Sequence, residues 1–391
     1  GPSGLMPTGA HAMPIQDQAP DYVRAIAPYQ GGLPIAEIAR RYGFSESQVV
    51  KLASNENPLG MGPMARAAMA AASQDLGRYP DGNGHDLKAA LSRRFDLPAD
   101  WLTIGNGSND ILELVAHAFL RPGRSSVFSA HSFAVYALVT QATGATAVVV
   151  PAVPQTLGHD LNEFLLHISP STAVVWVANP NNPTGSFLPG DEVEAFLEQV
   201  PSGVLVVLDE AYTEYLDPED RYPAFDWVRR FPNLLVSRSF SKAYGLAGLR
   251  VGYGVAQPGV TDLLNRVRQP FNVNSLAQAA AAAALFDDDF LLASAQLNRA
   301  GLEQMRVGLT ALGVAVLPSW GNFVLADLTA KRGGLPGVGG RCFEALLTKG
   351  VITRPVGNYG LPDHLRISIG TAAENNAFLA AMAQVLPGLA A

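Results

Sequence analysis

The sequence has one cysteine and no long apolar run, and each of these features excludes a class of protein. Cys342 alone cannot close an internal disulfide or build a cysteine-cluster metal site, so no metal centre is expected. We expect it to be a core thiol of a cytoplasmic protein. No window approaches the roughly 18 consecutive apolar residues of a membrane-spanning helix, so no membrane association is expected.

Charge is also scarce. The chain has 27 Lys and Arg against 34 Asp and Glu, and 27 − 34 gives a net charge of −7. An acidic balance without a basic tract argues against a nucleic-acid-binding protein. It says less about small anionic ligands, because a local basic cluster can oppose the global charge.

Apolar residues, by contrast, are abundant. They make up 48% of the 391 residues, which is enough for large packed cores and excludes disorder of the whole chain. This length predicts two or three domains, or one large domain with a smaller companion. Residues 1–13 are rich in Gly and Pro, without a basic start or an apolar block, and we expect a tag remnant or a disordered extension there.

In the middle of the chain, short apolar or β-branched runs alternate with segments of helical spacing, such as 111–120 and 191–199. This alternation predicts an α/β domain with a mostly parallel sheet covered by helices. Such sheets bind ligands beyond the carboxyl ends of their strands. The expected strands are residues 126–128, 147–150, 173–178, 204–208, 234–237 and 250–255.

After about residue 280 the pattern changes to that of a smaller α+β domain, which the helix expected at 35–42 could join. We therefore expect an N-terminal segment (14–52) that joins the small domain, a large domain (53–279) and a small C-terminal domain (280–391). The C-terminal elements expected are helices at 291–312, 342–349 and 373–385 and strands at 314–317, 322–327, 351–354 and 364–369.

Lys242 stands out among only five lysines, because it lies among small and apolar residues after an expected strand. A lysine in a low-dielectric pocket has a lowered pKa and becomes an amine nucleophile for carbonyl groups. Ser239 and Ser241 come just before it, and Arg250 follows eight residues later. Two hydroxyls and an arginine suit an anionic group such as a phosphate.

Other polar residues follow the neighbouring strands. Asp209, after the buried strand 204–208, is either a helix N-cap or a carboxylate aimed at a positive ring nitrogen. The turn 179–185 is either simply rigid or presents asparagine amides to a ligand. The glycines before Ser108 form either an ordinary cap or a phosphate-binding helix start. Together these residues predict one ligand with an aldehyde, a phosphate and a ring nitrogen, which is pyridoxal phosphate.

Three motifs carry a family resemblance: Asn-Pro-Asn-Asn-Pro-Thr-Gly at 179–185, Asp-Glu-Ala-Tyr at 209–212 and Ser-Phe-Ser-Lys at 239–242. In order and spacing they resemble the fold type I aminotransferases, over nearly the whole chain. Leu-Ala-Ser-Asn-Glu-Asn-Pro-Leu-Gly at 52–60, Arg-Tyr-Pro-Asp-Gly at 78–82 and Gly-Asn-Gly-Ser at 105–108 resemble the histidinol-phosphate aminotransferase branch. That branch is also similar to aromatic amino-acid aminotransferases and to a phosphothreonine decarboxylase.

The resemblance implies a role for each matching residue. Lys242 would hold the cofactor as an aldimine and then shuttle a proton, while Asp209 would keep the ring nitrogen protonated. Asn182 and Tyr212 would bond to the ring oxygen, and Phe133 would stack on the ring or be a core residue instead. The phosphate ligands would be Ser108, Asn109, Ser239, Ser241 and Arg250, with Tyr79 reaching in from a neighbouring subunit. Ser239 stands where threonine is frequent, but both carry a hydroxyl.

For the substrates, the resemblance implies that Arg366 grips the carboxylate of the acceptor acid and that Arg354 binds the phosphate of histidinol phosphate. Arg354 could instead be a surface arginine at a strand end. Tyr29 and Asn322 are weaker candidates for the substrate wall.

The leading hypothesis is a histidinol-phosphate:2-oxoglutarate aminotransferase of histidine biosynthesis with ping-pong transamination. The alternatives are an aromatic amino-acid aminotransferase, a phospho-amino-acid decarboxylase, and a regulatory domain, which is disfavoured because we see no room for a DNA-binding segment. Tyr79 and a composition with few charges predict a homodimer with shared active sites.

Overall fold

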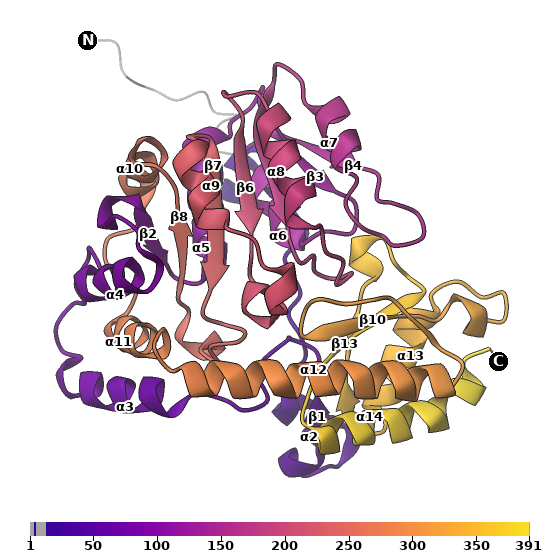
Figure 1. Cartoon of the computed structure of the whole chain (residues 1–391). Helices are drawn as coiled ribbons and strands as arrows, with labels where there is room; N and C mark the ends of the chain where they lie inside the picture. Colours follow the sequence, from indigo (N-terminus) through magenta and orange to yellow (C-terminus); the bar gives the residue numbers. More distant parts are fainter. Residues whose placement is uncertain (1–3, 5–12, 391) are drawn as a thin grey trace.

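The computed structural model describes residue 4 and residues 13–390, so the expectation for residues 1–13 lies almost entirely outside the described residues. A seven-stranded sheet is its largest element (Figure 1). All neighbouring strands are parallel except that β8 is antiparallel to β2 and β7, which confirms the mostly parallel sheet. The order is β2 (Leu102–Gly105), β8 (Gly252–Val255), β7 (Leu234–Ser239), β6 (Leu205–Asp209), β5 (Thr172–Ala178), β3 (Ser125–Ser129) and β4 (Thr146–Val150).

Helices cover both faces of this sheet, which explains why its central strands read as continuous apolar runs. In β5, Val174 and Trp176 face one core, while Val175 and Val177 face the other. The first core is completed by α5 (Ser108–Phe119), α6 (Ala134–Ala142) and α10 (Pro258–Val267). The second is completed by α3 (Pro63–Ala72), α4 (His85–Phe95), α7 (Leu161–His167), α8 (Gly190–Gln199), α9 (Ala224–Arg230) and α11 (Ser275–Ala284).

The C-terminal part of the chain forms a small α+β domain, as expected for the fold class. Its antiparallel sheet has the order β12 (Arg354–Pro355), β13 (His364–Ser368), β10 (Phe323–Asp327) and β9 (Ala315–Val316). Helices α12 (Asp288–Ala311), α13 (Val338–Leu347) and α14 (Ala372–Val385) pack on it, with Cys342 fully buried among them. In Figure 1, α12 extends below both parts of the molecule.

The expected strand 351–354 is in fact two short strands in different sheets. β11 (Val351–Ile352) pairs in parallel with β1 (Val50–Lys51), whereas β12 pairs with β13. Through β1 and α2 (Ile35–Tyr42), the N-terminal segment therefore packs beside C-terminal elements, and Ile38 contacts the cluster that contains Leu347. Between residues 13 and 390, no helix is long and apolar enough to cross a membrane.

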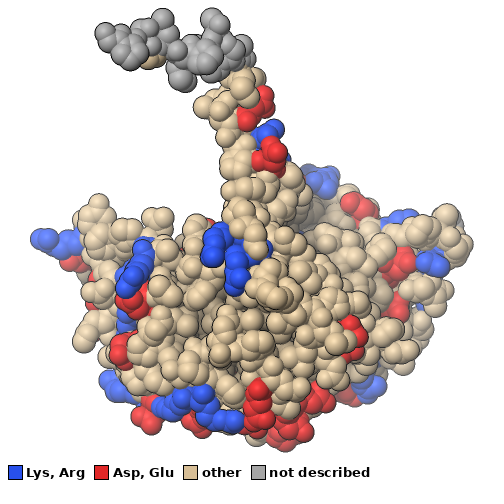
Figure 2. Space-filling model, turned by 90° about the horizontal axis from the view of Figure 1, so that it is seen from above, with Lys and Arg blue, Asp and Glu red and all other residues tan. Residues whose placement is uncertain are grey.

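The N-terminal residues 14–24, with the short helix α1 (Asp21–Arg24), extend from the body of the protein and are mostly exposed (Figure 2). Figure 2 also shows charged side chains of both signs mainly around the rim of this face, with wide areas that carry none.

Candidate active site

A cavity of about 320 Å³ lies at the carboxyl edge of the large sheet. The loops after β2, β3, β5, β6 and β7 all reach it, because these strands point in the same direction. Segment 53–56 and the strands β12 and β13 close its other side. Four cationic side chains line it, against only two acidic ones. The cations are Lys242, Arg250, Arg354 and Arg366, and the acids are Asp209 and Glu56.

Lys242 brings its amine into this cavity from the loop that follows β7. Its Nζ donates a hydrogen bond to the carbonyl oxygen of Ser54 at 3.0 Å. Burial, together with the nearby charge of Arg366, lowers the pKa of Lys242 to about 7. A large fraction of the amine is therefore neutral near pH 7, which is the form that attacks a carbonyl carbon.

Asp209 ends β6 with one carboxylate oxygen satisfied and one free. Its Oδ2 accepts a hydrogen bond from the Tyr136 hydroxyl at 2.5 Å, and the Tyr136 ring stacks on Trp176. Its Oδ1 is buried and has no partner among the described residues. Burial raises the pKa of Asp209 to about 6, opposed by the bond from Tyr136. A buried carboxylate with a free oxygen needs a donor or a cation, which a ligand in the cavity can supply.

A small polar cradle lies beside Lys242, where α5 begins. The α5 start has no side-chain cap, so the backbone N–H groups of Ser108 and Asn109 remain available to an anion. Ser239 Oγ accepts from the backbone N–H of Ser241 at 2.9 Å, and Arg250 Nη1 donates to Ser241 Oγ at 3.3 Å.

Glycine keeps this cradle open. A Cβ atom at Gly107, where φ is +80°, would lie 2.5 Å from Arg250 Nη2, so a side chain there would displace the guanidinium. The cradle combines hydroxyls, free N–H groups and a cation, which is the donor set that a phosphate requires.

Arg354 and Arg366 are direct cross-strand neighbours on β12 and β13, so their guanidinium groups enter the cavity from one side. Arg366 Nη1 donates to Asn182 Oδ1 at 2.6 Å, and its buried Nε has no partner among the described residues. Arg354 Nη2 donates to the carbonyl oxygen of Gln30, and its guanidinium lies 5.7 Å from the centre of the Tyr29 ring. A larger hollow of about 940 Å³ adjoins the cavity and shares Tyr29, Phe133 and Arg354 with it.

Thirteen of the fifteen residues expected at the site line this cavity, and two do not. Tyr79 is 81% exposed and stacks on Phe271 instead. Asn322 is buried outside the lining, where its amide donates to the carbonyl oxygen of Asn55 at 2.7 Å. Asn322 precedes β10 (Phe323–Asp327), and its amide is directed toward segment 53–55 and not into the cavity.

Three residues near the cavity were not singled out from the sequence. Tyr136 lies one helical turn after Phe133 and supports Asp209. Asn55 contacts Tyr212, and Glu56 lines the cavity next to it. Asn55 and Glu56 lie within the motif 52–60, which marked the segment without marking these side chains.

The donors and acceptors of the cavity fit pyridoxal phosphate. The free Asp209 oxygen suits a protonated ring nitrogen, the neutral Lys242 amine suits an aldehyde, and the glycine-bordered cradle suits a phosphate. The fold and this site together define a pyridoxal-phosphate-dependent enzyme of fold type I.

Comparisons with known proteins give the family. The model of the family "Aminotransferase class I and II" matches residues 47–382, and the chain belongs to that family. A "Histidinol-phosphate aminotransferase 2" from Ralstonia nicotianae is 59% identical, over 94% of this chain and 96% of the relative. A "Histidinol-phosphate aminotransferase" from Methylobacillus flagellatus is 54% identical, over 95% and 98%.

A solved structure agrees with these sequence relatives. The crystal structure of histidinol-phosphate aminotransferase from Sinorhizobium meliloti in complex with pyridoxal-5'-phosphate superposes with a TM-score of 0.86 at 29% identity, over 94% of this chain and 97% of that chain. This chain is therefore a pyridoxal-phosphate-dependent aminotransferase of the histidinol-phosphate aminotransferase branch.

Proposed function

We propose that this enzyme transfers the amino group of histidinol phosphate to 2-oxoglutarate, as a step of histidine biosynthesis. The observation that carries the proposal is the pair of neighbouring guanidinium groups, Arg354 and Arg366, at one wall of the cavity. A phosphorylated donor and a dicarboxylate acceptor both need such a cationic wall. The names of the relatives support the same reaction.

The proposed roles follow from the contacts. Bound pyridoxal phosphate would supply a carbonyl for the amine and an electron sink for the carbanion at the substrate Cα. Asp209 would hold a proton on the ring nitrogen through its free Oδ1, and Tyr136 would keep Asp209 ionised. Lys242 would bind the cofactor covalently, yield its place to the incoming amine, and then carry the proton away from Cα.

The remaining side chains would hold the cofactor and the substrates. Tyr212 and Asn182 would bond to the ring oxygen, Phe133 would stack on the ring, and Arg366 would bind the carboxylate of the acceptor. Arg354 and Tyr29 would contact the donor, with the phosphate on Arg354. The phosphate of the cofactor would lie in the cradle of Ser108, Asn109, Ser239, Ser241 and Arg250.

We predict that Arg354→Ala lowers kcat/KM for histidinol phosphate by about 10- to 100-fold, because it removes charge-assisted hydrogen bonds to a phosphate. Phenylalanine, which has no phosphate, should react as with the parent enzyme. The measurement is single-turnover loss of the visible absorbance of bound cofactor with each donor. Arg354→Lys, which keeps the charge but not the planar fork, should give an intermediate loss.

An equal loss of kcat/KM with both donors would show that Arg354 only stabilises the structure of the cavity wall and does not bind the phosphate. If phenylalanine also exceeds histidinol phosphate in the parent enzyme, the substrate is an aromatic amino acid. The specific observation in favour of this second candidate is the adjoining hollow, where Phe128, Phe133 and Leu138 are among the lining residues.

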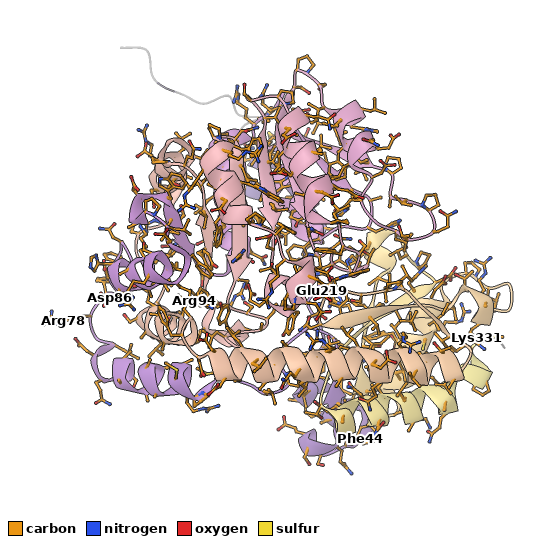
Figure 3. The ribbon with its side chains drawn as sticks, viewed as in Figure 1. Phe44, Arg78, Asp86, Arg94, Glu219 and Lys331 are labelled. Atoms are coloured by element: carbon orange, nitrogen blue, oxygen red, sulfur yellow. The ribbon has the colours of Figure 1, made fainter. Side chains whose placement is uncertain are left out.

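We also propose a cytoplasmic homodimer in which Tyr79 completes the active site of the partner subunit. Tyr79 is largely exposed and lies outside its own cavity. Its neighbour Arg78 is at the outer edge of the molecule in Figure 3. The exposed Tyr79–Phe271 stack is an apolar surface that a second subunit could cover.

Complementation tests this arrangement. Tyr79→Ala and Lys242→Ala chains are each expected to be impaired, but after mixing and exchange a mixed dimer should contain one site with Lys242 from one chain and Tyr79 from the other. Activity should therefore recover to about a quarter of the parent value, since half of the dimers are mixed and each has one intact site. Recovery should be absent if Tyr79 serves its own chain, and that result would contradict the shared site.

A further inference from the structure

Asn55 is a buried asparagine between β1 and α3 that no role described so far includes. Its side chain is 1% exposed, and its backbone lies in the left-handed region with φ of 56°, which asparagine tolerates better than most residues. Its carboxamide lies between two hydroxyl groups, those of Ser368 on β13 and Tyr212 after β6. Asn55 thus joins the small domain to the floor of the cavity.

The direction of each hydrogen bond in this group can be worked out from the number of protons available. The backbone N–H of Asn55 must donate, and it donates to Ser368 Oγ at 2.8 Å. The single proton of Ser368 is then donated to Asn55 Oδ1, which is 2.7 Å away. This orients the carboxamide, so that Asn55 Nδ2 donates to the Tyr212 hydroxyl oxygen at 3.0 Å. Tyr212 is therefore an acceptor on this side, and its own proton must be donated elsewhere.

The remaining surroundings of Tyr212 leave the cavity as the place for that proton. Of the charged and titratable groups near Tyr212, Arg366 and Lys242 are cationic, and no hydrogen bond joins the Tyr212 hydroxyl to Asp209 or Tyr359. Tyr212 lines the cavity, and burial raises its pKa to about 12, so it keeps its proton at neutral pH.

We propose that Asn55 is a positioning residue that directs the phenolic proton of Tyr212 into the cavity, toward the ring oxygen of the cofactor. This inference rests on the role proposed above for Tyr212. The reverse orientation of the carboxamide would place Oδ1 against the phenol, and Tyr212 would then donate its proton to Asn55 and not to a ligand.

Hydrogen bonds from both sides of the cavity fix the backbone around Asn55. This keeps the Asn55 carboxamide in its place beside Tyr212. Three successive carbonyl oxygens, those of Ala53, Ser54 and Asn55, each accept one side-chain hydrogen bond. The donors are Arg366, Lys242 and Asn322. Asn322, which lies outside the cavity, is thereby connected to the site through Asn55.

The test is a pH titration of the visible absorbance of the holoenzyme, which reports the proton on the Lys242 nitrogen joined to the cofactor. A hydrogen bond donated to the ring oxygen stabilises the negative charge of that oxygen. The oxygen then attracts the proton on the Lys242 nitrogen less strongly. Losing the donor should therefore raise the pH midpoint. For Asn55→Gly, which tolerates the positive φ, and for Ser368→Ala, we expect a rise of about 0.5 to 1 unit, as for a typical hydrogen bond.

A double-mutant cycle separates positioning from general damage. In a Tyr212→Phe background, Asn55→Gly should add no further shift, because the proton that it directs is gone. Asn375→Ala removes an equally buried carboxamide, which bonds to Gly370 and Gln304 and not to Tyr212. This variant should leave the midpoint unchanged. If Asn55→Gly fails to fold, Ser368→Ala carries the same comparison.

Three outcomes would overturn the inference. An equal shift from Asn55→Gly with and without the Tyr212 hydroxyl would show that Asn55 does not act through Tyr212. A shift in Tyr212→Phe without one in Asn55→Gly or Ser368→Ala would overturn the role of Asn55 and leave the proposed role of Tyr212 intact. No shift in Tyr212→Phe, in a holoenzyme that still forms, would also remove the proposed role of Tyr212.

Discussion

Replacing Lys242 with alanine is expected to reduce turnover by about 10⁴-fold or more, because one amine serves as both covalent anchor and proton carrier. No other lysine is expected to take over, since Lys242 is the only lysine among the described residues that line the cavity. Its lowered pKa of about 7 makes the amine reactive at neutral pH, and the described residues that line the cavity include no histidine that could replace it. The measurement is kcat with saturating cofactor and both substrates.

The control for this variant is Lys88→Ala. Lys88, on α4, also has a pKa lowered by burial, but it lies outside the cavity. It should retain parent activity, since a lowered pKa alone does not make a lysine catalytic. Substantial turnover by Lys242→Ala would mean that another group abstracts the proton, and the assignment of Lys242 as proton carrier would be wrong.

The second large effect is expected for Asp209→Asn, which should lower kcat by about 100- to 1,000-fold. Loss of the charge partner of a buried cation costs roughly 3 kcal/mol or more, and each 1.36 kcal/mol is a factor of ten. The asparagine cannot stabilise a proton on the ring nitrogen, so the electron sink weakens. Cofactor affinity should also fall, and equilibrium binding of pyridoxal phosphate measures this separately from turnover.

Asp287→Asn is a matched control, because Asp209 and Asp287 are both 6% exposed. Asp287 caps α12 by accepting from the backbone N–H of Phe290, a role that the amide oxygen of asparagine can keep, and its Oδ2 also accepts from the backbone N–H of Met64 at 3.3 Å. Neither contact lies in the cavity. Asp287→Asn should therefore leave kcat unchanged. An equal loss in both variants would indicate general destabilisation and would remove the case for a specific charge at Asp209.

Much of the fold could be predicted from the sequence because burial on both faces leaves a simple signature. The strands at β5, β6 and β7 were expected almost to the residue, since continuous apolar runs end there at polar loops. β2 was missed because it is only four residues long, and its neighbouring glycines suggested a loop. The strand expected at 351–354 was divided because pairing partners depend on tertiary structure, which a local pattern does not contain.

The same contrast holds for the site. Lys242 could be found because lysines are rare in this chain and this one lies among small and apolar residues. Asp209 could be found because a charged carboxylate at the end of a buried strand is energetically costly without a partner. Tyr136 and Asn55 act through hydrogen bonds to residues 73 and 157 positions away, so no local pattern marks them. Asn322 lies outside the cavity lining for the same reason, because its hydrogen bond to Asn55 joins residues 267 positions apart.

The net charge also proved a poor guide to the ligands. An acidic chain gathers Lys242, Arg250, Arg354 and Arg366 around one cavity, so the local sign is opposite to the global one. Such a cavity attracts the anionic cofactor and substrates proposed here, while the acidic remainder of the surface does not.

The central claim is that Lys242 carries the cofactor, and peptide mapping of the borohydride-reduced holoenzyme tests it most directly. The account predicts one stable pyridoxyl-phosphate addition per chain, located by mass spectrometry on the peptide that contains Lys242. Addition at another lysine, or no addition in a protein saturated with pyridoxal phosphate, would contradict it.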